Sequence, residues 1–361
     1  MRTLLFTLEY PPQVGGVANY YGNLASYWPI GEHLLILDNN RRELLKSHGF
    51  LAWWPTLFTL KRKIALSRID YVLVGQILPL GTVVWLLFWF KPLKYAVFIH
   101  GMDFAYALKM RRKKWLSFCI LRRADKIIAA NSYVAEQIQL AYPRFSDKVA
   151  VINPGVPGNT PNISESETLS LKSKYNLSDK TVLFSIGRLV KRKGVDRVIQ
   201  ALSLMTPEQA AGIVYVVAGA GSQMEYLSRL VPSKLRDKVI FLGMISESEK
   251  WLWLSACDIF IMPSRDIEGD FEGFGIVYLE ANLCGKPVIA GNSGGVRDAV
   301  IDNQTGLIAD SESPADIKEK ILALATNAAQ RAELGKNGRA RAISDFNWEK
   351  QAVKLVKIIK Q

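Results

Sequence analysis

The chain has 361 residues, of which 49% are hydrophobic, which is enough for two α/β domains of ordinary size and excludes a disordered chain. Its three cysteines lie far apart within apolar segments, so we interpret them as reduced core residues of a cytoplasmic protein and expect no disulfide framework. The net charge of +13 is uneven, because residues 1–155 hold 20 Lys and Arg against 9 Asp and Glu, whereas the remainder holds 26 against 24. The basic first half therefore calls for an acidic partner.

No segment has the pattern of a membrane span or a signal peptide. The apolar start of the chain is interrupted at Glu9 and Pro11, and suits a first buried strand. The longest apolar run, 77–90, contains Pro79 and Gly81 and is shorter than the roughly 20 residues that a spanning helix needs. We therefore expect no transmembrane segment.

The first half alternates short apolar runs with helical patterns, as an α/β domain does. The expected strands are 2–8, 33–37, 71–74, 95–99, 127–130 and 149–152. Gly15 and Gly16 stand where the first loop meets the first helix, and would let a phosphate approach bare backbone; the alternative, which two glycines alone do not exclude, is a simple tight turn. His100 follows a strand at the sheet edge where such folds bind ligands; the alternative is a satisfied core histidine.

Two segments of the first half combine basic residues with large apolar side chains. Residues 109–123 hold Arg111, Arg112, Lys113 and Lys114 beside Trp115 and Phe118, and residues 53–63 place Trp53, Trp54 and Phe58 before Lys61, Arg62 and Lys63. This composition is typical of docking on an anionic membrane. The aromatics could instead be core and the charges a solvated face. A basic charge also fits a soluble acidic acceptor, and charge alone does not exclude nucleic acid, which we nevertheless do not expect as a partner.

The second half follows a polar stretch, 157–167, that we interpret as a linker. Its expected strands are 181–186, 213–217, 239–242, 258–262 and 287–290. Arg188 and Lys193 lie in the loop after the first of these strands, where two cations could hold a diphosphate. We expect Lys191 and Arg192 to point outward. A solvated basic turn is the alternative.

The stretch 258–295 holds the densest set of candidate residues. A strand, a polar loop and an expected helix, 274–283, follow one another, with Glu272 at the helix mouth and Glu280 two turns inside. The helix N-terminus can bind an anion, and Gly273 and Gly275 would let it approach closely. A carboxylate among apolar neighbours, such as Glu280, is costly unless it binds something. The alternative is that both glutamates face water.

The sequence E-G-F-G-I-V-Y-L-E at 272–280, with P-S-R before it and G-K-P-V-I-A-G-N-S-G-G after it, closely resembles the donor site of the family 4 retaining glycosyltransferases. G-R-x-x-x-x-K-G at 187–194 is similar to the same family. The resemblance implies an α/β GT-B fold, with two Rossmann-like domains facing each other across a cleft. It implies an N-terminal acceptor-side domain at 1–156, a nucleotide-sugar-binding domain at 157–344, and a terminal helix at 345–361 that returns to the first domain.

The resemblance also implies a role for each candidate residue. Arg188 and Lys193 would stabilise the donor diphosphate, assisted by backbone near Gly15, Gly16, Gly273, Phe274 and Gly275. Ile245 would pack on the base, Glu280 would bind the ribose, and Glu272 and His100 would bind the sugar. The acceptor would attack on the face that the diphosphate leaves, without a protein nucleophile. The resemblance implies neither metal nor cofactor, so we interpret Asp266, Glu268 and Asp270 as loop acids; metal ligation is their alternative.

Three functions compete at this point. The favoured one is a retaining hexosyltransferase that uses a nucleotide-diphosphate sugar, with GDP-mannose preferred and UDP-glucose possible, and a lipid-linked or cell-envelope glycan as acceptor. The alternatives are a sugar-nucleotide epimerase or phosphorylase of the same architecture, and a non-catalytic sugar-nucleotide-binding protein. We expect the protein to be cytoplasmic and peripheral on the inner face of the membrane.

Overall fold

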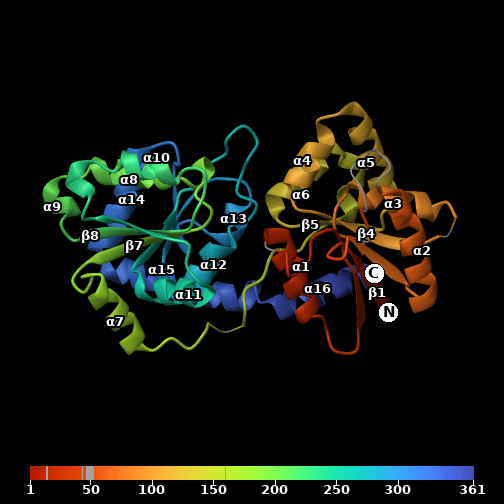
Figure 1. Cartoon of the computed structure of the whole chain (residues 1–361), viewed down its shortest axis with the longest axis horizontal. Helices are drawn as coiled ribbons and strands as arrows, with labels where there is room; N and C mark the ends of the chain where they lie inside the picture. The colour runs from red at the N-terminus through yellow and green to blue at the C-terminus, as the bar shows by residue number, and fades with distance from the viewer. Residues whose placement is uncertain (14, 43, 46–52, 91, 159) are drawn as a thin grey trace. The chain divides into compact units, whose positions relative to one another are not determined.

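The computed structural model describes residues 1–361 apart from 14, 43, 46–52, 91 and 159 (Figure 1). The described residues form two compact units, one made of 1–155 and 348–361 and the other of 156–347. The first boundary, between residues 155 and 156, lies one residue earlier than the sequence predicts. The second boundary, between residues 347 and 348, lies three residues later. The reason is local: the Val156 amide donates to the Phe346 carbonyl at 2.6 Å, and both side chains lie in the core of the second unit.

The first unit is built on a parallel sheet, whose six described strands lie in the order β2-β1-β3-β4-β5-β6. The strands are β1 (Arg2–Phe6), β2 (His33–Leu37), β3 (Tyr71–Val74), β4 (Lys94–Ile99), β5 (Lys126–Ala129) and β6 (Val149–Val151). The helices are α1 (Gly16–Ser26), α2 (Trp54–Ser67), α3 (Leu80–Phe88), α4 (Met102–Leu108), α5 (Arg111–Arg123), α6 (Ser132–Ala141), the 3-10 helix η1 (Pro143–Lys148) and α16 (Trp348–Lys360).

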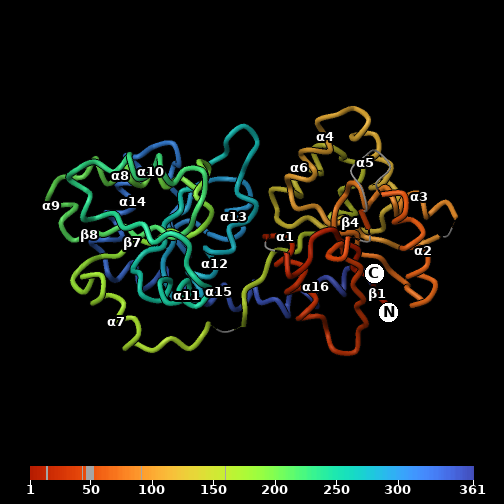
Figure 2. The backbone as a smooth tube through the Cα atoms, viewed as in Figure 1, coloured from red at the N-terminus to blue at the C-terminus, as the bar shows by residue number. Residues whose placement is uncertain are grey.

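Side chains of the first sheet alternate between two apolar cores, as the period of two along a strand requires. Leu4 and Phe6 pack under α2, α3, α5 and α6, whereas Leu5 packs under α1 and α16. Figure 2 shows α16 next to α1, although they lie at opposite ends of the chain, and the two helices are in contact. The expected return of the terminal helix to the first domain is confirmed.

The second unit repeats this plan with a parallel sheet of described strands in the order β12-β11-β10-β7-β8-β9. The strands are β7 (Thr181–Ile186), β8 (Ile213–Ala218), β9 (Val239–Gly243), β10 (Ile259–Met262), β11 (Val288–Gly291) and β12 (Gly306–Ala309). The helices are α7 (Glu165–Lys174), η2 (Lys191–Lys193), α8 (Val195–Ser203), α9 (Pro207–Ala210), α10 (Met224–Leu230), η3 (Ser233–Leu235), α11 (Glu247–Ala256), α12 (Ile276–Leu283), α13 (Val296–Ala299), α14 (Pro314–Thr326) and α15 (Ala328–Asp345). Two parallel α/β units confirm the expected fold class.

One expectation about the linker is wrong at its end. Helix α7 begins within the expected linker, because Ser164 and Glu167 form a capping box that satisfies amides at the helix start.

The sequence predicts no transmembrane segment. In the part of the chain that the structure describes, no helix is both long and apolar enough to cross a bilayer.

Candidate active site

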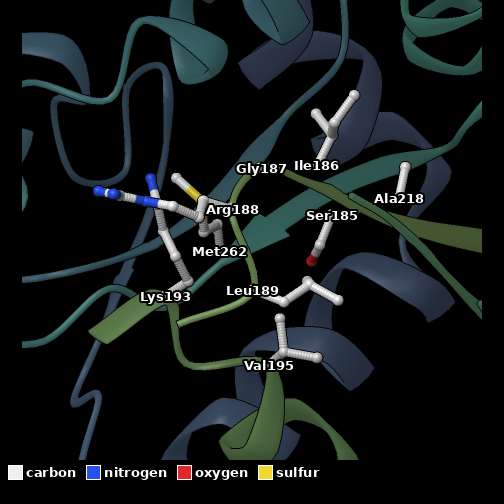
Figure 3. A pocket seen from close by; sticks show the side chains of 9 residues that line it. All are labelled: Ser185, Ile186, Gly187, Arg188, Leu189, Lys193, Val195, Ala218 and Met262. Atoms are coloured by element: carbon white, nitrogen blue, oxygen red, sulfur yellow. The ribbon is translucent and has the colours of Figure 1, made fainter. Parts of the chain in front are cut away.

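The candidate residues of the second unit gather where the strand order of its sheet reverses. Strand β7 pairs with β8 on one side and with β10 on the other, so the loops after β7 and β10 leave in different directions. Ligands of open parallel sheets bind at the carboxyl ends of strands at such a point. Residues 185–189, Lys193, Val195, Ala218 and Met262 line a small pocket there, and both Arg188 and Lys193 extend toward the same side of it (Figure 3).

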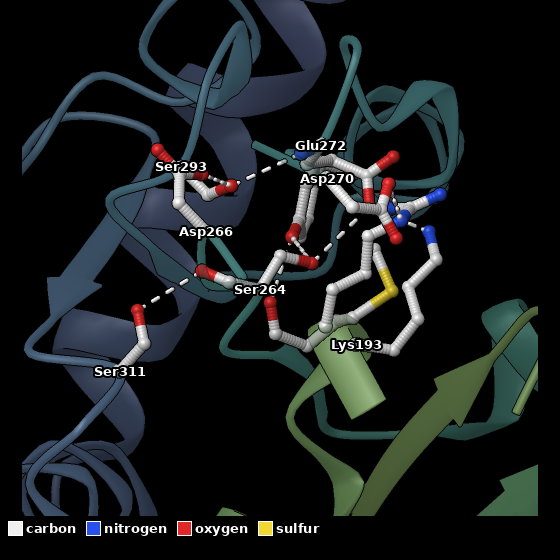
Figure 4. A network of polar contacts seen from close by, with 10 residues as sticks. Lys193, Ser264, Asp266, Asp270, Glu272, Ser293 and Ser311 are labelled. Carbon is white, nitrogen blue, oxygen red and sulfur yellow. Dashed lines mark hydrogen bonds and ion pairs between the residues drawn. The ribbon is translucent and has the colours of Figure 1, made fainter. Parts of the chain in front are cut away.

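Lys193 and Glu272 form the centre of a buried ion cluster. Glu272 Oε2 lies 2.7 Å from Lys193 Nζ and 2.6 Å from Arg192 Nη1, and it accepts a hydrogen bond from the Ser264 hydroxyl at 3.2 Å (Figure 4). Burial alone would raise the pKa of Glu272, but the two cations hold it below its ordinary value. Burial lowers the pKa of Lys193 against the attraction of Glu272. Glu272 is therefore an ionised carboxylate that neutralises the cations beside it.

The expected outward direction of Arg192 is wrong. Its side chain is 11% exposed, and it contacts both Glu272 and Asp270, the latter at 3.1 Å from its Nε. Lys191, in contrast, is exposed as expected. Both residues lie in η2, a 3-10 turn with about three residues per turn, so successive side chains point in different directions. The acidic loop after β10 meets Arg192 and leaves Lys191 in solvent.

The three loop acids have separate surroundings. Asp266 accepts a hydrogen bond from the Ser293 hydroxyl, whose oxygen in turn accepts from the Glu272 amide at 3.0 Å. Asp270 pairs with Arg192, and Glu268 is exposed. Among the residues that the structure places, no three His, Cys, Asp or Glu side chains come together as metal ligands would. Asp266 and Asp270 thus stabilise the loop that carries Glu272.

Glu280 has a protein partner of its own. It lies on α12, and its Oε1 is 2.7 Å from Nζ of Lys250 on α11, which also contacts Glu247 at 2.6 Å. Burial raises the pKa of Glu280, and Lys250 opposes this effect. Ile245 lies just before Ser246, the N-cap of α11, and packs on the same core as α12. Glu280 and Ile245 therefore border one region of the second unit, where Lys250 pairs with the Glu280 carboxylate.

Glycine is required where α12 begins. Gly275 caps the helix with φ +75°, and a Cβ there would lie 2.2 Å from Tyr278 Cε2. Tyr278 cannot move away easily, because its hydroxyl donates to the Met262 carbonyl at 2.7 Å. A Cβ on Gly273 would meet no atom within 4 Å, so there is free space beside this residue. Phe274, between them, is buried and packs against Phe346.

The first unit carries the other candidates at the carboxyl ends of β1 and β4. Gly15 caps α1, and Gly16, its first residue, has open space where a side chain would be. His100 follows β4 and stacks on Phe98 at an interplanar angle of 10°. Its Nε2 lies 2.7 Å from the Tyr21 hydroxyl, and burial lowers the pKa of His100 to about 4. His100 is therefore a neutral ring held in one orientation.

Comparisons with known proteins agree with this geometry. Residues 168–341 match the family described as glycosyl transferases group 1, and residues 14–158 match glycosyltransferase family 4. A glycosyltransferase from Rickettsia africae has the same fold, with a TM-score of 0.82 and 20% identity over 99% of this chain and 98% of the other. HepE from Anabaena, solved in complex with UDP, gives a TM-score of 0.81 with 18% identity over the whole of both chains. The chain is a GT-B glycosyltransferase.

Two curated relatives of this glycosyltransferase are mannosyltransferases. The GDP-mannose-dependent alpha-(1-6)-phosphatidylinositol monomannoside mannosyltransferase of Mycobacterium tuberculosis is 26% identical over 384 residues, which cover 99% of this chain and 98% of the relative. The Corynebacterium glutamicum enzyme, which acts on the monoacylated form of that glycolipid according to its name, is 28% identical over 378 residues, covering 99% and 97%.

Several residues of this glycosyltransferase site were not found from the sequence. They are Tyr21, Arg192, Lys250, Ser264 and Ser293. Most of them act through contacts between distant segments, as Lys250 does with Glu280 across 30 positions and Arg192 with Glu272 across 80, whereas Ser264 contacts Glu272 across eight. No local pattern reports such pairs. The one available signal was the position of Arg192 directly beside Lys193.

Proposed function

We propose that this glycosyltransferase is a retaining enzyme that transfers a mannosyl group from GDP-mannose to a hydroxyl of a lipid-linked or cell-envelope glycan. The observation that carries the proposal is the placement of Arg188, Lys193 and Glu272 at the switch point of the second sheet. Similarity along nearly the full length to GDP-mannose-dependent enzymes favours this donor. UDP-glucose is the second candidate donor.

In this proposal the chain supplies electrostatic stabilisation and positioning, not a nucleophile. Arg188 and Lys193 neutralise the diphosphate as the glycosidic bond breaks, and the space that the missing side chains leave at Gly16 and Gly273 accommodates its oxygens. The anomeric carbon then accepts the acceptor oxygen on the face that the diphosphate leaves, and the acceptor proton passes to the departing phosphate oxygen. Glu272 and His100 hold the hexose, and Glu280 holds the ribose.

The first test is a screen of donors by thermal stabilisation, followed by transfer assays. GDP-mannose should raise the melting temperature more than UDP-glucose does, and an α-linked product should form from the α-linked donor with a glycolipid acceptor. Transfer should persist in EDTA, because fixed cations take the role that a metal often has. Interconversion of the donor sugar without acceptor would favour the epimerase, phosphate-dependent release would favour the phosphorylase, and binding without turnover would favour the binding protein.

The two glutamates have distinct assignments, which substitutions can separate. Glu280→Gln should weaken binding of bare GDP as well as GDP-mannose, because it loses a contact to the ribose. Glu272→Gln should leave GDP binding nearly intact and mainly lower transfer from GDP-mannose. Calorimetry with both ligands makes the comparison, and equal losses of GDP affinity in both variants would contradict the assignment.

The first unit offers a surface for an anionic membrane, which we propose as the route to a lipid-linked acceptor on the cytoplasmic face. Helices α3 and α4 each contact α5, and Tyr106 of α4, Trp115 of α5 and Trp89, which follows α3, are more than 60% exposed. Trp54 and Phe58 of α2 are exposed as well, whereas Trp53 and Phe118 pack on the core. Aromatic side chains flanked by cations suit a bilayer interface. We call the exposed aromatic side chains Trp54, Phe58, Trp89, Tyr106 and Trp115, together with residues 111–114, the basic-aromatic surface.

A further inference from the structure

A short chain of hydrogen bonds in the first unit determines where the proton of His100 lies. The Tyr21 hydroxyl oxygen is 2.7 Å from the Gly75 carbonyl oxygen and 2.7 Å from His100 Nε2. A hydroxyl carries one proton, and a carbonyl oxygen can only accept, so the Tyr21 proton goes to Gly75. Nε2 must then donate its own proton to the Tyr21 oxygen, because two bare lone pairs at this distance would repel. A neutral His100 ring therefore has its free lone pair on Nδ1.

The surroundings hold the ring in this state. Phe98 stacks on it, and Tyr20 presses on it edge to face with ring centroids 5.3 Å apart. Asp103 Oδ1 accepts from the amides of His100 at 3.1 Å and Gly101 at 2.9 Å, which fixes the turn after β4. Burial lowers the pKa of His100 to about 4 and raises that of Tyr21 well above its ordinary value. Both groups stay neutral near pH 7, and the hydrogen bonds of the described residues leave Nδ1 without a partner.

We propose that Tyr21 is a positioning residue, which holds His100 as the Nε2–H tautomer so that Nδ1 accepts a hydrogen bond from a hydroxyl of the bound hexose. This rests on the proposed function, in which His100 contacts the donor sugar. A His100 in this state can neither protonate a leaving group nor pair electrostatically with a phosphate. It recognises a hydroxyl proton, and so discriminates against sugar analogues that lack that hydroxyl.

Nuclear magnetic resonance can read the tautomer directly, because the chain has three histidines. The protein is labelled with ¹⁵N-histidine, and His33→Gln and His48→Gln assign the remaining signal. We expect His100 to show a protonated Nε2 and an unprotonated Nδ1 from pH 8 down to about 5.5. A protonated Nδ1 in that range, in either tautomer or charge state, would overturn the inference. This readout needs neither donor nor activity.

The neighbouring tyrosine provides a matched control for substitution. Tyr21→Phe removes the acceptor for Nε2–H, and should produce a mixture of tautomers and an about tenfold lower kcat, the effect of one lost hydrogen bond. Tyr20→Phe removes a hydroxyl that donates to the Ile152 carbonyl at 2.9 Å and makes no hydrogen bond to His100, so tautomer and kcat should stay unchanged. Equal effects of both substitutions on the tautomer would contradict a specific role of Tyr21.

Deoxyfluoro analogues of the donor sugar complete the test, because fluorine cannot donate a hydrogen bond. At one hydroxyl position the substitution should raise the KM of the wild type about tenfold, yet have little effect on His100→Ala. The same penalty in both proteins at every position would overturn the assignment of Nδ1 to a hydroxyl. Failure of the wild type to bind any nucleotide sugar would instead overturn the proposed function, while the NMR result would still decide the tautomer.

Discussion

Arg188 and Lys193 lie on the same pocket but have different surroundings. Arg188 is exposed and has no ion-pair partner among the described residues, whereas Lys193 is paired with buried Glu272. Both side chains are assigned to the donor diphosphate. Only Lys193, however, also neutralises the buried Glu272 carboxylate in the ligand-free protein. Substituting Lys193 should therefore lower the stability of the fold, whereas substituting Arg188 should not.

Replacing each cation by alanine should separate catalysis from stability. Arg188→Ala should lower kcat about a hundredfold without changing the melting temperature, since it loses only a contact to the diphosphate. Lys193→Ala should lower kcat similarly and also destabilise the fold by about 1–3 kcal/mol, because the buried Glu272 carboxylate then has only Arg192 to neutralise it. Steady-state kinetics and thermal unfolding measure the two effects. Lys191→Ala, an exposed cation of the same turn, is the control and should change neither.

The half-buried His100 and Asp103 should give the protein opposing pH dependences. The folded pKa of His100, about 4, is below its unfolded value near 6.5, so its contribution to stability is present above pH 6.5 and is lost as the pH falls to 4. Burial raises the pKa of Asp103 to about 6, so its folded form binds a proton first and stability rises as the pH falls from 6 toward 3.8. The two effects largely cancel between pH 6 and 4.

Removing His100 should expose the effect of Asp103. His100→Gln should therefore gain stability relative to the wild type as the pH falls from 6.5 to 4, at no more than about 1.4 kcal/mol per pH unit. Urea unfolding at several pH values measures the difference. His33→Gln, at an exposed position, provides the reference. A difference between His100→Gln and wild type that stays constant with pH would contradict the prediction.

At the scale of elements, the start of α12 is the most constrained feature of the site. Gly275→Ala should cost several kcal/mol, because φ +75° disfavours a side chain and the new Cβ would meet Tyr278. Gly273→Ala should leave stability nearly unchanged, since no atom lies within 4 Å of the new Cβ. It should nevertheless weaken donor binding, because the added methyl group would occupy space that the donor needs. Chemical unfolding and donor titration measure the effects of both substitutions. A Gly275→Ala protein with unchanged stability would contradict the prediction, since it would mean that the Tyr278 side chain can move away from the new Cβ.

The elements that could be predicted from the sequence are those that form continuous apolar runs. Strands β2, β3 and β7 have the expected bounds, because each is a short run of mainly apolar residues between polar or turn-forming segments. Strand β12 (Gly306–Ala309) was not predicted, since four residues beginning with glycine carry little signal and its place comes from pairing with β11. The direction of Arg192 failed for a related reason: it depends on a loop 80 residues away.

At the scale of the whole molecule, the net charge belongs to the first unit alone. With α16 included, that unit holds 24 Lys and Arg against 10 Asp and Glu, and the second unit holds 22 against 23. The exposed aromatic side chains of α2 to α5 lie on the same unit as this charge. Charge and apolar exposure therefore coincide, as a membrane-docking unit requires.

Sedimentation with vesicles should show whether the basic-aromatic surface binds lipid. Binding should require anionic lipid, weaken at high salt, and fall when Arg111, Arg112, Lys113 and Lys114 are neutralised, at about 1 kcal/mol per charge. A variant with four cations of the second unit neutralised, namely Lys234, Arg236, Lys336 and Arg339, removes the same charge and should bind normally. Absence of binding at low salt would favour a soluble acceptor.

The return of α16 to the first unit has a consequence for how the protein is made. Trp348, Ala352, Leu355 and Ile359 belong to the core shared with Leu5, Tyr21 and Phe98. A ribosome therefore synthesises the whole second unit, 156–347, before the side chains that complete the first unit emerge. Until then, one face of the first sheet is partly uncovered, so the first unit cannot complete its core before residues 156–347 have been synthesised.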